Sequence, residues 1–152
     1  VEFYANNAMD KPDYLIGEEV QVNGAGKALR YMFKPSRDGV SADCWSGTVG
    51  GRDVHFGSGV ANHFFYLLAE GAVAPSGYND PPAQLVCNGN TTLAGFGRDK
   101  AQRIWYRALT VYFTSTTDYA GARVATMQAA RDLYGDAGSL AVGRAWSAVN
   151  VN

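Results

Sequence analysis

Residues 53–71 read Asp-Val-His-Phe-Gly-Ser-Gly-Val-Ala-Asn-His-Phe-Phe-Tyr-Leu-Leu-Ala-Glu-Gly, and this stretch organises the rest of the chain. Its large apolar residues at i, i+4, i+7 and i+8 are Val60, Phe64, Leu67 and Leu68. That spacing predicts a helix with one buried face. Ser58 can cap this helix, and Gly71 can end it. We therefore expect His55 just outside the helix N-terminus, on an exposed turn from which its ring can reach a ligand.

The pair Asp53 and His55 has two interpretations. A carboxylate two residues before a histidine can fix the tautomer of the imidazole for acid–base work. The same pair can instead be a structural feature of a helix-entry turn. Ser58 also suggests a Ser-His-Asp hydrolase, but Phe56 stands where the Gly-x-Ser-x-Gly elbow needs a glycine. We exclude that class and interpret Ser58 as a helix cap.

The composition predicts one globular domain. The chain has 152 residues, of which 47% are hydrophobic and 18% charged, so it can bury a sizeable core and is not intrinsically disordered. The net charge is −1 and basic residues form no run, which argues against a nucleic-acid partner. No apolar stretch approaches the roughly 18 residues that a membrane span needs.

Three further helices are predicted at the end of the chain, over residues 101–112, 118–135 and 139–149. Asp118 and Ser139 can cap the second and the third of them. The large apolar residues expected to face inward include Leu109, Val124, Leu133, Leu140 and Trp146. Strand-like alternation is almost missing. The sequence therefore predicts a mainly α protein, a helical bundle with one long irregular arm.

The irregular arm covers residues 21–54, which are rich in glycine and show no sustained period. A connection of that length in a compact domain is usually functional or disordered. Arg30 lies inside it, between Leu29 and Tyr31. Its guanidinium can be a positioned hydrogen-bond fork or a charge that lies over the edge of the core.

The two cysteines, Cys44 and Cys87, fall in loop-like segments. An even count in exposed loops fits one disulfide and an oxidising compartment, whereas the alternative is two free buried thiols. The chain has no Cys-x-x-Cys motif and no paired histidine nearby, which excludes a zinc site built on these cysteines. We predict that Cys44 and Cys87 are joined.

An acidic, turn-rich segment follows the first residues of the chain. Its carboxylates, together with one residue upstream, are Glu2, Asp10, Asp13, Glu18 and Glu19. Carboxylates at uneven spacing in a loop suit calcium, which takes about six to eight oxygen ligands with loose geometry. A solvated acidic loop is the alternative.

Several separated motifs, in this order along the chain, resemble the thermolysin family of secreted zinc endopeptidases. They are Leu-Ile-Gly (15–17), Ala-Leu-Arg-Tyr-Met-x-x-Pro-Ser-Arg-Asp-Gly (28–39), Asp-Val-His-x-x-Ser-Gly-Val-x-Asn (53–62), Gly-Arg-Asp-Lys (97–100), Tyr-Arg-Ala-Leu-Thr (106–110) and Ala-Ala-x-Asp-Leu-Tyr-Gly (129–135). The first two resemble the pseudolysin and vibriolysin branch. The resemblance runs from Val1 to about Val151 but covers only the family's C-terminal, α-helical domain. Residues 1–152 are thus expected to be that single domain, without the N-terminal zinc-binding half.

The resemblance implies a chain that is one half of a secreted endopeptidase acting on peptides or proteins. Val1 to Asn6 look like the last turns of a helix already under way, without an initiator methionine or signal peptide, which suggests that more chain precedes it. The family's His-Glu-x-x-His motif belongs to that earlier part. The zinc ligands are therefore expected outside this chain, in the N-terminal half as partner. The alternative is a non-catalytic module that binds a peptide or an inhibitor.

The resemblance also implies roles for individual residues. His55 matches the histidine that donates a hydrogen bond or a proton to the oxygen of the tetrahedral intermediate, and Asp53 matches the aspartate that holds its ring. Arg30 matches the arginine that binds a substrate backbone carbonyl. The positions that line the family's apolar S1′ pocket are Ile16, Val20 and Leu29. Those that match calcium ligands are Glu2, Asp13, the carbonyl of Leu15 and Glu18.

Overall fold

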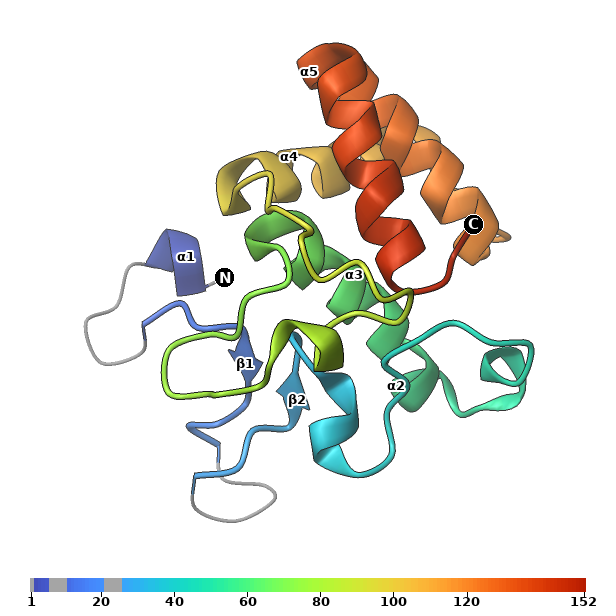
Figure 1. The fold of residues 1–152 in the computed structure, drawn as a ribbon. Coiled ribbons are helices and arrows are strands. Elements are labelled where there is room, and N and C mark those ends of the chain that lie inside the picture. The colour runs from blue at the N-terminus through green and yellow to red at the C-terminus, as the bar shows by residue number, and fades with distance from the viewer. Residues whose placement is uncertain (1, 6–10, 21–25) are drawn as a thin grey trace.

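Helices dominate the computed structural model, which describes residues 2–5, 11–20 and 26–152 (Figure 1). The α-helices are α1 (Glu2–Ala5), α2 (Val54–Gly57), α3 (Gly59–Glu70), α4 (Arg98–Arg107) and α5 (Tyr119–Ala148). Shorter helical turns are the 3-10 segments Pro35–Asp38, Val49–Gly51 and Pro82–Gln84, and the π-helical segment Ala108–Tyr112. The strands β1 (Leu15–Ile16) and β2 (Arg30–Tyr31) pair antiparallel. The prediction of a mainly α protein is confirmed.

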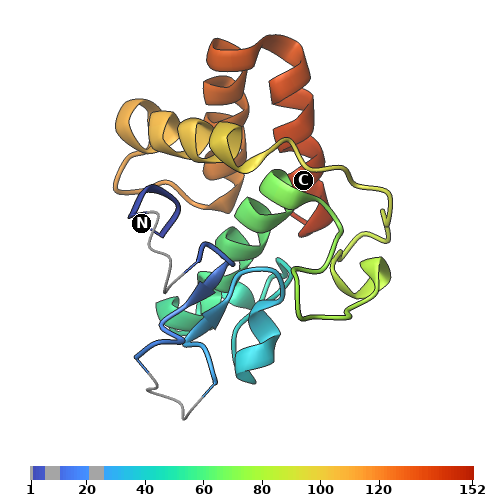
Figure 2. The same ribbon diagram turned by 90° about the vertical axis from the view of Figure 1, so that its left-hand side faces the viewer.

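Helix α3 is the centre of the molecule, as its periodicity predicts. Figures 1 and 2 show it between α4 and α5 on one side and the region of β1 and β2 on the other. The four residues of its predicted apolar face, Val60, Phe64, Leu67 and Leu68, are all buried. The Phe64 ring stacks on Trp146 of α5, with 3.7 Å between the ring centroids. Gly71 ends the helix with a φ of 80°, and its N–H donates to the carbonyl of Leu67, as expected.

Helix α5 bends sharply at Gly135, where φ is 69° and ψ is −161°. Asp118 caps its first turn, because its Oδ1 accepts from the N–H of Gly121 at 2.8 Å. The predicted cap at Asp118 and the predicted end of the second helix at residue 135 are therefore confirmed. The prediction that Ser139 caps the second half is wrong: Ser139 is buried inside the helix, which resumes directly after the bend.

The predicted inward faces of the last helices are partly wrong. Four of the large apolar residues are exposed by 41–69%: Leu109, Val124, Leu133 and Leu140. Near Leu109 the buried face is formed by Ala101, Ile104 and Ala108, which recur at helical spacing, and Leu109 lies beside this face. In α5 small residues such as Ala129, Ala130 and Ala145 form much of the buried face.

The irregular arm is linked to the end of α5 by backbone hydrogen bonds that lie beside the disulfide. Cys44 and Cys87 are joined, with an S–S distance of 2.02 Å, as predicted. The N–H of Cys87 donates to the carbonyl of Ala148 at 2.7 Å, and that of Trp45 donates to the carbonyl of Val149 at 2.8 Å. We call this set of contacts the C-terminal junction. It ties two loops to the end of α5.

His63 of α3 lies beneath the same loops and is 1% exposed. Its Nδ1 is 2.9 Å from the carbonyl oxygen of Asp43, and its Nε2 is 2.9 Å from that of Leu85. Burial lowers the pKa of the His63 ring, against the opposing effect of the two carbonyls. The ring therefore lies between both disulfide-linked loops and the central helix, with one carbonyl within reach of each nitrogen. No helix in the described ranges is both long and apolar enough to cross a membrane.

Candidate functional site

Asp53 and His55 form one unit at the start of α2. A single carboxylate oxygen, Oδ1 of Asp53, accepts from the backbone N–H of His55 at 2.9 Å and lies 2.7 Å from the Nδ1 of its ring. Asp53 is thus the N-cap of α2 and the partner of the imidazole at once. The bond from the backbone N–H of His55, followed by that from its ring, holds the pKa of the Asp53 carboxyl below its usual value.

The structure refines one prediction about this turn and corrects another. His55 lies before α3, as predicted, but in a separate short helix, because Asp53 caps α2, which begins at Val54. Ser58, the predicted cap of α3, has helical backbone angles and makes no capping bond. Its hydroxyl instead donates to the carbonyl of His55 at 3.2 Å. The expectation of exposure holds, because the His55 side chain is 72% exposed.

The predicted substrate-binding residues gather on the β1–β2 hairpin. Arg30 pairs directly with Ile16 across the ladder, and the N–H of Leu29 donates to the carbonyl of Ile16 at 2.7 Å. Val20 belongs to the turn after β1, where its N–H donates to the carbonyl of Gly17 at 3.2 Å. Ile16, Leu29 and Val20 are exposed by 44%, 38% and 71%. The hairpin thus presents apolar side chains to the surface beside a guanidinium.

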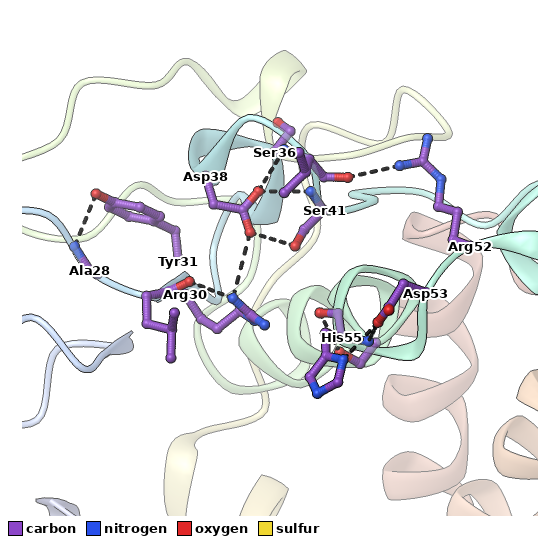
Figure 3. A network of polar contacts seen from close by, with 12 residues as sticks. Ala28, Arg30, Tyr31, Ser36, Asp38, Ser41, Arg52, Asp53 and His55 are labelled. Carbon is purple, nitrogen blue, oxygen red and sulfur yellow. Dashed lines mark hydrogen bonds and ion pairs between the residues drawn. The ribbon is translucent and has the colours of Figure 1, made fainter. Parts of the chain in front are cut away.

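Asp38 is a functional candidate that the sequence reasoning missed (Figure 3). Its side chain is 5% exposed and lies 3.9 Å from the Nη1 of Arg30. It also accepts from the N–H of Val40 at 2.9 Å and from both the N–H and the hydroxyl of Ser41. Burial raises the pKa of the Asp38 carboxyl, but the bonds from Ser41 and Val40 and the charge of Arg30 outweigh it and keep the pKa below its usual value.

The motif Asp38-Gly39 is a turn signal, and that part of the arrangement could be read from the sequence. Nothing in the spacing shows that the turn folds back onto Arg30, eight residues earlier. The turn also contacts α2. Arg52 donates to the carbonyl of Val40 at 2.8 Å, and the N–H of Ala42 donates to the carbonyl of Phe56 at 3.1 Å.

The candidate calcium ligands are only partly described. Asp13 accepts through Oδ1 from the N–H of Leu15 at 2.9 Å, so this carboxylate shapes the turn before β1. Asp10 and the side chain of Glu2 lie outside the described residues. Within the described part, no three His, Cys, Asp or Glu side chains lie close enough together to hold a metal ion.

Comparison with known proteins supports the resemblance to the thermolysin family. The family described as thermolysin metallopeptidase, alpha-helical domain, matches residues 1–151. The chain is 47% identical to the transglutaminase-activating metalloprotease of Streptomyces mobaraensis, over 99% of this chain and 20% of that protein. It is 39% identical to bacillolysin of Bacillus caldolyticus, over 89% of this chain and 22% of that protein, and 39% identical to bacillolysin of Bacillus cereus, over 100% and 25%.

The chain spans only a fifth to a quarter of the length of these relatives. The match nevertheless covers the whole described hairpin, the Asp53–His55 unit and the helical core. The chain belongs to the thermolysin metallopeptidase family, as its alpha-helical domain.

Proposed function

We propose that this domain forms one wall of the active site of a secreted, zinc-dependent endopeptidase. The observation that carries the proposal is the Asp53–His55 unit, an exposed imidazole whose orientation is set by a carboxylate and a helix cap. Zinc, which the family implies, would polarise a peptide carbonyl. The described residues contain no set of side chains that fits it, so its ligands are assigned to the N-terminal half of the same enzyme.

His55 would stabilise the negative charge that develops on the carbonyl oxygen when a peptide bond is attacked. Asp53 accepts a hydrogen bond from Nδ1 of His55, and Nε2 therefore lies on the side of the ring that faces away from Asp53. When Nδ1 carries the proton shared with Asp53, Nε2 can donate only if it also carries a proton. A donor aimed at developing charge contributes more in the transition state than in the ground state, and therefore acts on kcat.

The hairpin would bind the substrate next to the cut. Arg30 would donate to a backbone carbonyl of the peptide, since its planar guanidinium offers several N–H groups in fixed directions. Ile16, Val20 and Leu29 would receive an apolar side chain on the carboxyl side of the cleaved bond. Their exposure on one hairpin supports this assignment.

Calcium and secretion complete the proposal. Glu2, Asp13, the carbonyl of Leu15 and Glu18 would contribute oxygen ligands to one calcium ion in the complete protein. The Cys44–Cys87 disulfide supports an extracellular location, because disulfides persist mainly in oxidising compartments.

The test is kinetic and uses the complete enzyme. His55→Phe should lower kcat by about 10²–10³ with KM little changed and zinc content unaltered, because it removes one transition-state donor. Asp53→Asn should cause a smaller loss. The isolated domain should cleave no casein, because the described part has no zinc ligands. A His55→Phe enzyme with full kcat would show that the ring is structural.

A further inference from the structure

The loop of residues 38–42 touches both halves of the proposed site. On one side Asp38 faces the guanidinium of Arg30 on β2, at 3.9 Å. On the other side the N–H of Ala42 donates to the carbonyl of Phe56 in α2, and Arg52, two residues before α2, donates to the carbonyl of Val40. Figure 3 shows Asp38, Arg30 and Arg52 together with the Asp53–His55 unit.

The Asp38 carboxylate accepts three hydrogen bonds from its own loop, in addition to its contact with Arg30. Its Oδ1 accepts from the N–H groups of Val40 and Ser41 at 2.9 and 2.7 Å, and its Oδ2 accepts from the hydroxyl of Ser41. The Arg30 guanidinium faces this same Oδ2. A carboxylate fixed by three donors of its own loop cannot follow a moving partner, so the guanidinium must adapt to it.

The spacing between the loop and the helices is also fixed. A Cβ at Gly59, the first residue of α3, would lie 2.5 Å from the carbonyl oxygen of Ala42 and 3.0 Å from the Cβ of Pro35. Only a glycine there lets the loop approach so closely, which leaves the backbone around Ala42 little freedom to move. The backbone between the Arg30 contact and the helices is therefore closely packed at Ala42.

We propose that Asp38 is a positioning residue for Arg30, and that the loop of residues 38–42 fixes the spacing between Arg30 and His55. The inference rests on the proposed function, in which Arg30 binds a substrate carbonyl. The Asp38 carboxylate attracts the Nη1 end of the guanidinium at 3.9 Å without a hydrogen bond, and the same Nη1 donates to the carbonyl of Leu29 at 2.7 Å. The remaining N–H groups are then aimed at one place before the substrate arrives.

The experiment is a double-mutant cycle in the complete enzyme. Asp38→Asn keeps the size of the side chain and an oxygen for the two backbone donors, but removes the charge that faces Arg30. It should lower kcat/KM about 10-fold, mainly through KM, and should have no further effect in an enzyme that already carries Arg30→Ala. Ser41→Ala, which removes only the hydroxyl donor, should give a smaller loss of the same kind and serves if Asp38→Asn does not fold.

Asp80 offers a matched control. Its side chain is also 5% exposed, and it pairs with Lys34 at 3.1 Å and Arg37 at 2.6 Å. Asp80→Asn therefore removes a comparable buried charge. Its effect should be the same with and without Arg30→Ala. If Asp38→Asn behaves like this control, with effects that add to those of Arg30→Ala, then Asp38 acts on stability alone and the inference is wrong.

A second measurement separates this inference from the proposed function. In the complete protein labelled with ¹⁵N-arginine, Asp38→Asn should speed up rotation of the Arg30 guanidinium about its Nε–Cζ bond, whereas Asp80→Asn should not. Unchanged rotation in Asp38→Asn would overturn the positioning role. Unchanged kcat/KM in Arg30→Ala would overturn the role of Arg30 and this inference with it. A protein without any peptidase activity would overturn the proposed function only.

Discussion

The helical core and the irregular arm of this domain are stabilised by different interactions. The core around α3 is an apolar interior in which Phe64 and Trp146 are fully buried against each other. The arm is held by carboxylates that accept several hydrogen bonds each, such as Asp38 and Asp80, and by one disulfide. Of the proposed site residues, Leu29, Arg30 and Asp53 lie on the arm, and His55 directly follows it. The geometry of these site residues should therefore depend on pH and redox state more than the geometry of the core does.

The largest effect is expected from the core. Phe64→Ala should lower the free energy of unfolding by about 3–5 kcal/mol, because it removes a fully buried ring and leaves a cavity beside Trp146. Urea unfolding followed by tryptophan fluorescence measures the change. A loss below about 1 kcal/mol would show that the core is loosely packed and that the contrast with the arm is wrong.

Breaking the disulfide should come next. Replacing both Cys44 and Cys87 by serine opens a link between residues 43 positions apart. In the chain-entropy model this costs roughly 4 kcal/mol as an upper value, and less if native contacts such as those of His63 already restrict the loops. Thermal unfolding with and without a reductant measures it. Two titratable thiols on the unreduced, denatured protein would refute the disulfide itself.

Asp80→Asn should cost roughly 2 kcal/mol, since it weakens charge-assisted bonds from Lys34 and Arg37. Burial raises the pKa of the Asp80 carboxyl, but the bonds from Arg37 and Lys34 outweigh it and keep that pKa below its usual value. A carboxyl whose pKa is lowered on folding stabilises the fold above its unfolded pKa, and this contribution is lost as pH falls through the folded pKa. The wild-type melting temperature should therefore fall more steeply on acidification than that of Asp80→Asn. Parallel curves would contradict this.

The smallest effect is expected at the exposed apolar residues of α5. Val124→Thr should change the free energy of unfolding by less than about 0.5 kcal/mol, because the Val124 side chain is 69% exposed. Denaturant unfolding of the isolated domain provides the measurement. A loss as large as that of Phe64→Ala would mean that this face is buried in solution and belongs to an interface.

Local signals predicted much of the core. The apolar period of α3, the cap at Asp118 and the stops at Gly71 and Gly135 depend on residues within a few positions of each other, and all appear where expected. The faces of the last helices were harder to predict. There small buried alanines form much of the inward side, and a period of large apolar residues does not show them.

In the candidate site, too, contacts between residues close in the sequence could be predicted, and contacts between distant segments could not. Asp53 and His55 are two residues apart, so their contact could be expected from the sequence. The roles of Arg30, Ile16, Val20 and Leu29 came from the family resemblance alone. Asp38, Arg52 and His63 were missed because each acts through a contact between segments that are eight or more residues apart. Such contacts depend on how the arm folds back on the helices.

The C-terminal junction has a consequence for the lifetime of the domain among proteases. A folded chain is cut when a segment opens into an extended form, and when opening and closing are fast the cutting rate follows the population of that open form. Here the loops that carry Cys44 and Cys87 are bonded to Ala148 and Val149, so opening any of the three segments disturbs the other two. In the endopeptidase proposed above, these few bonds would protect the irregular segments from autolysis. Under reducing conditions we expect cleavage by an added protease to begin there, before the helices unfold.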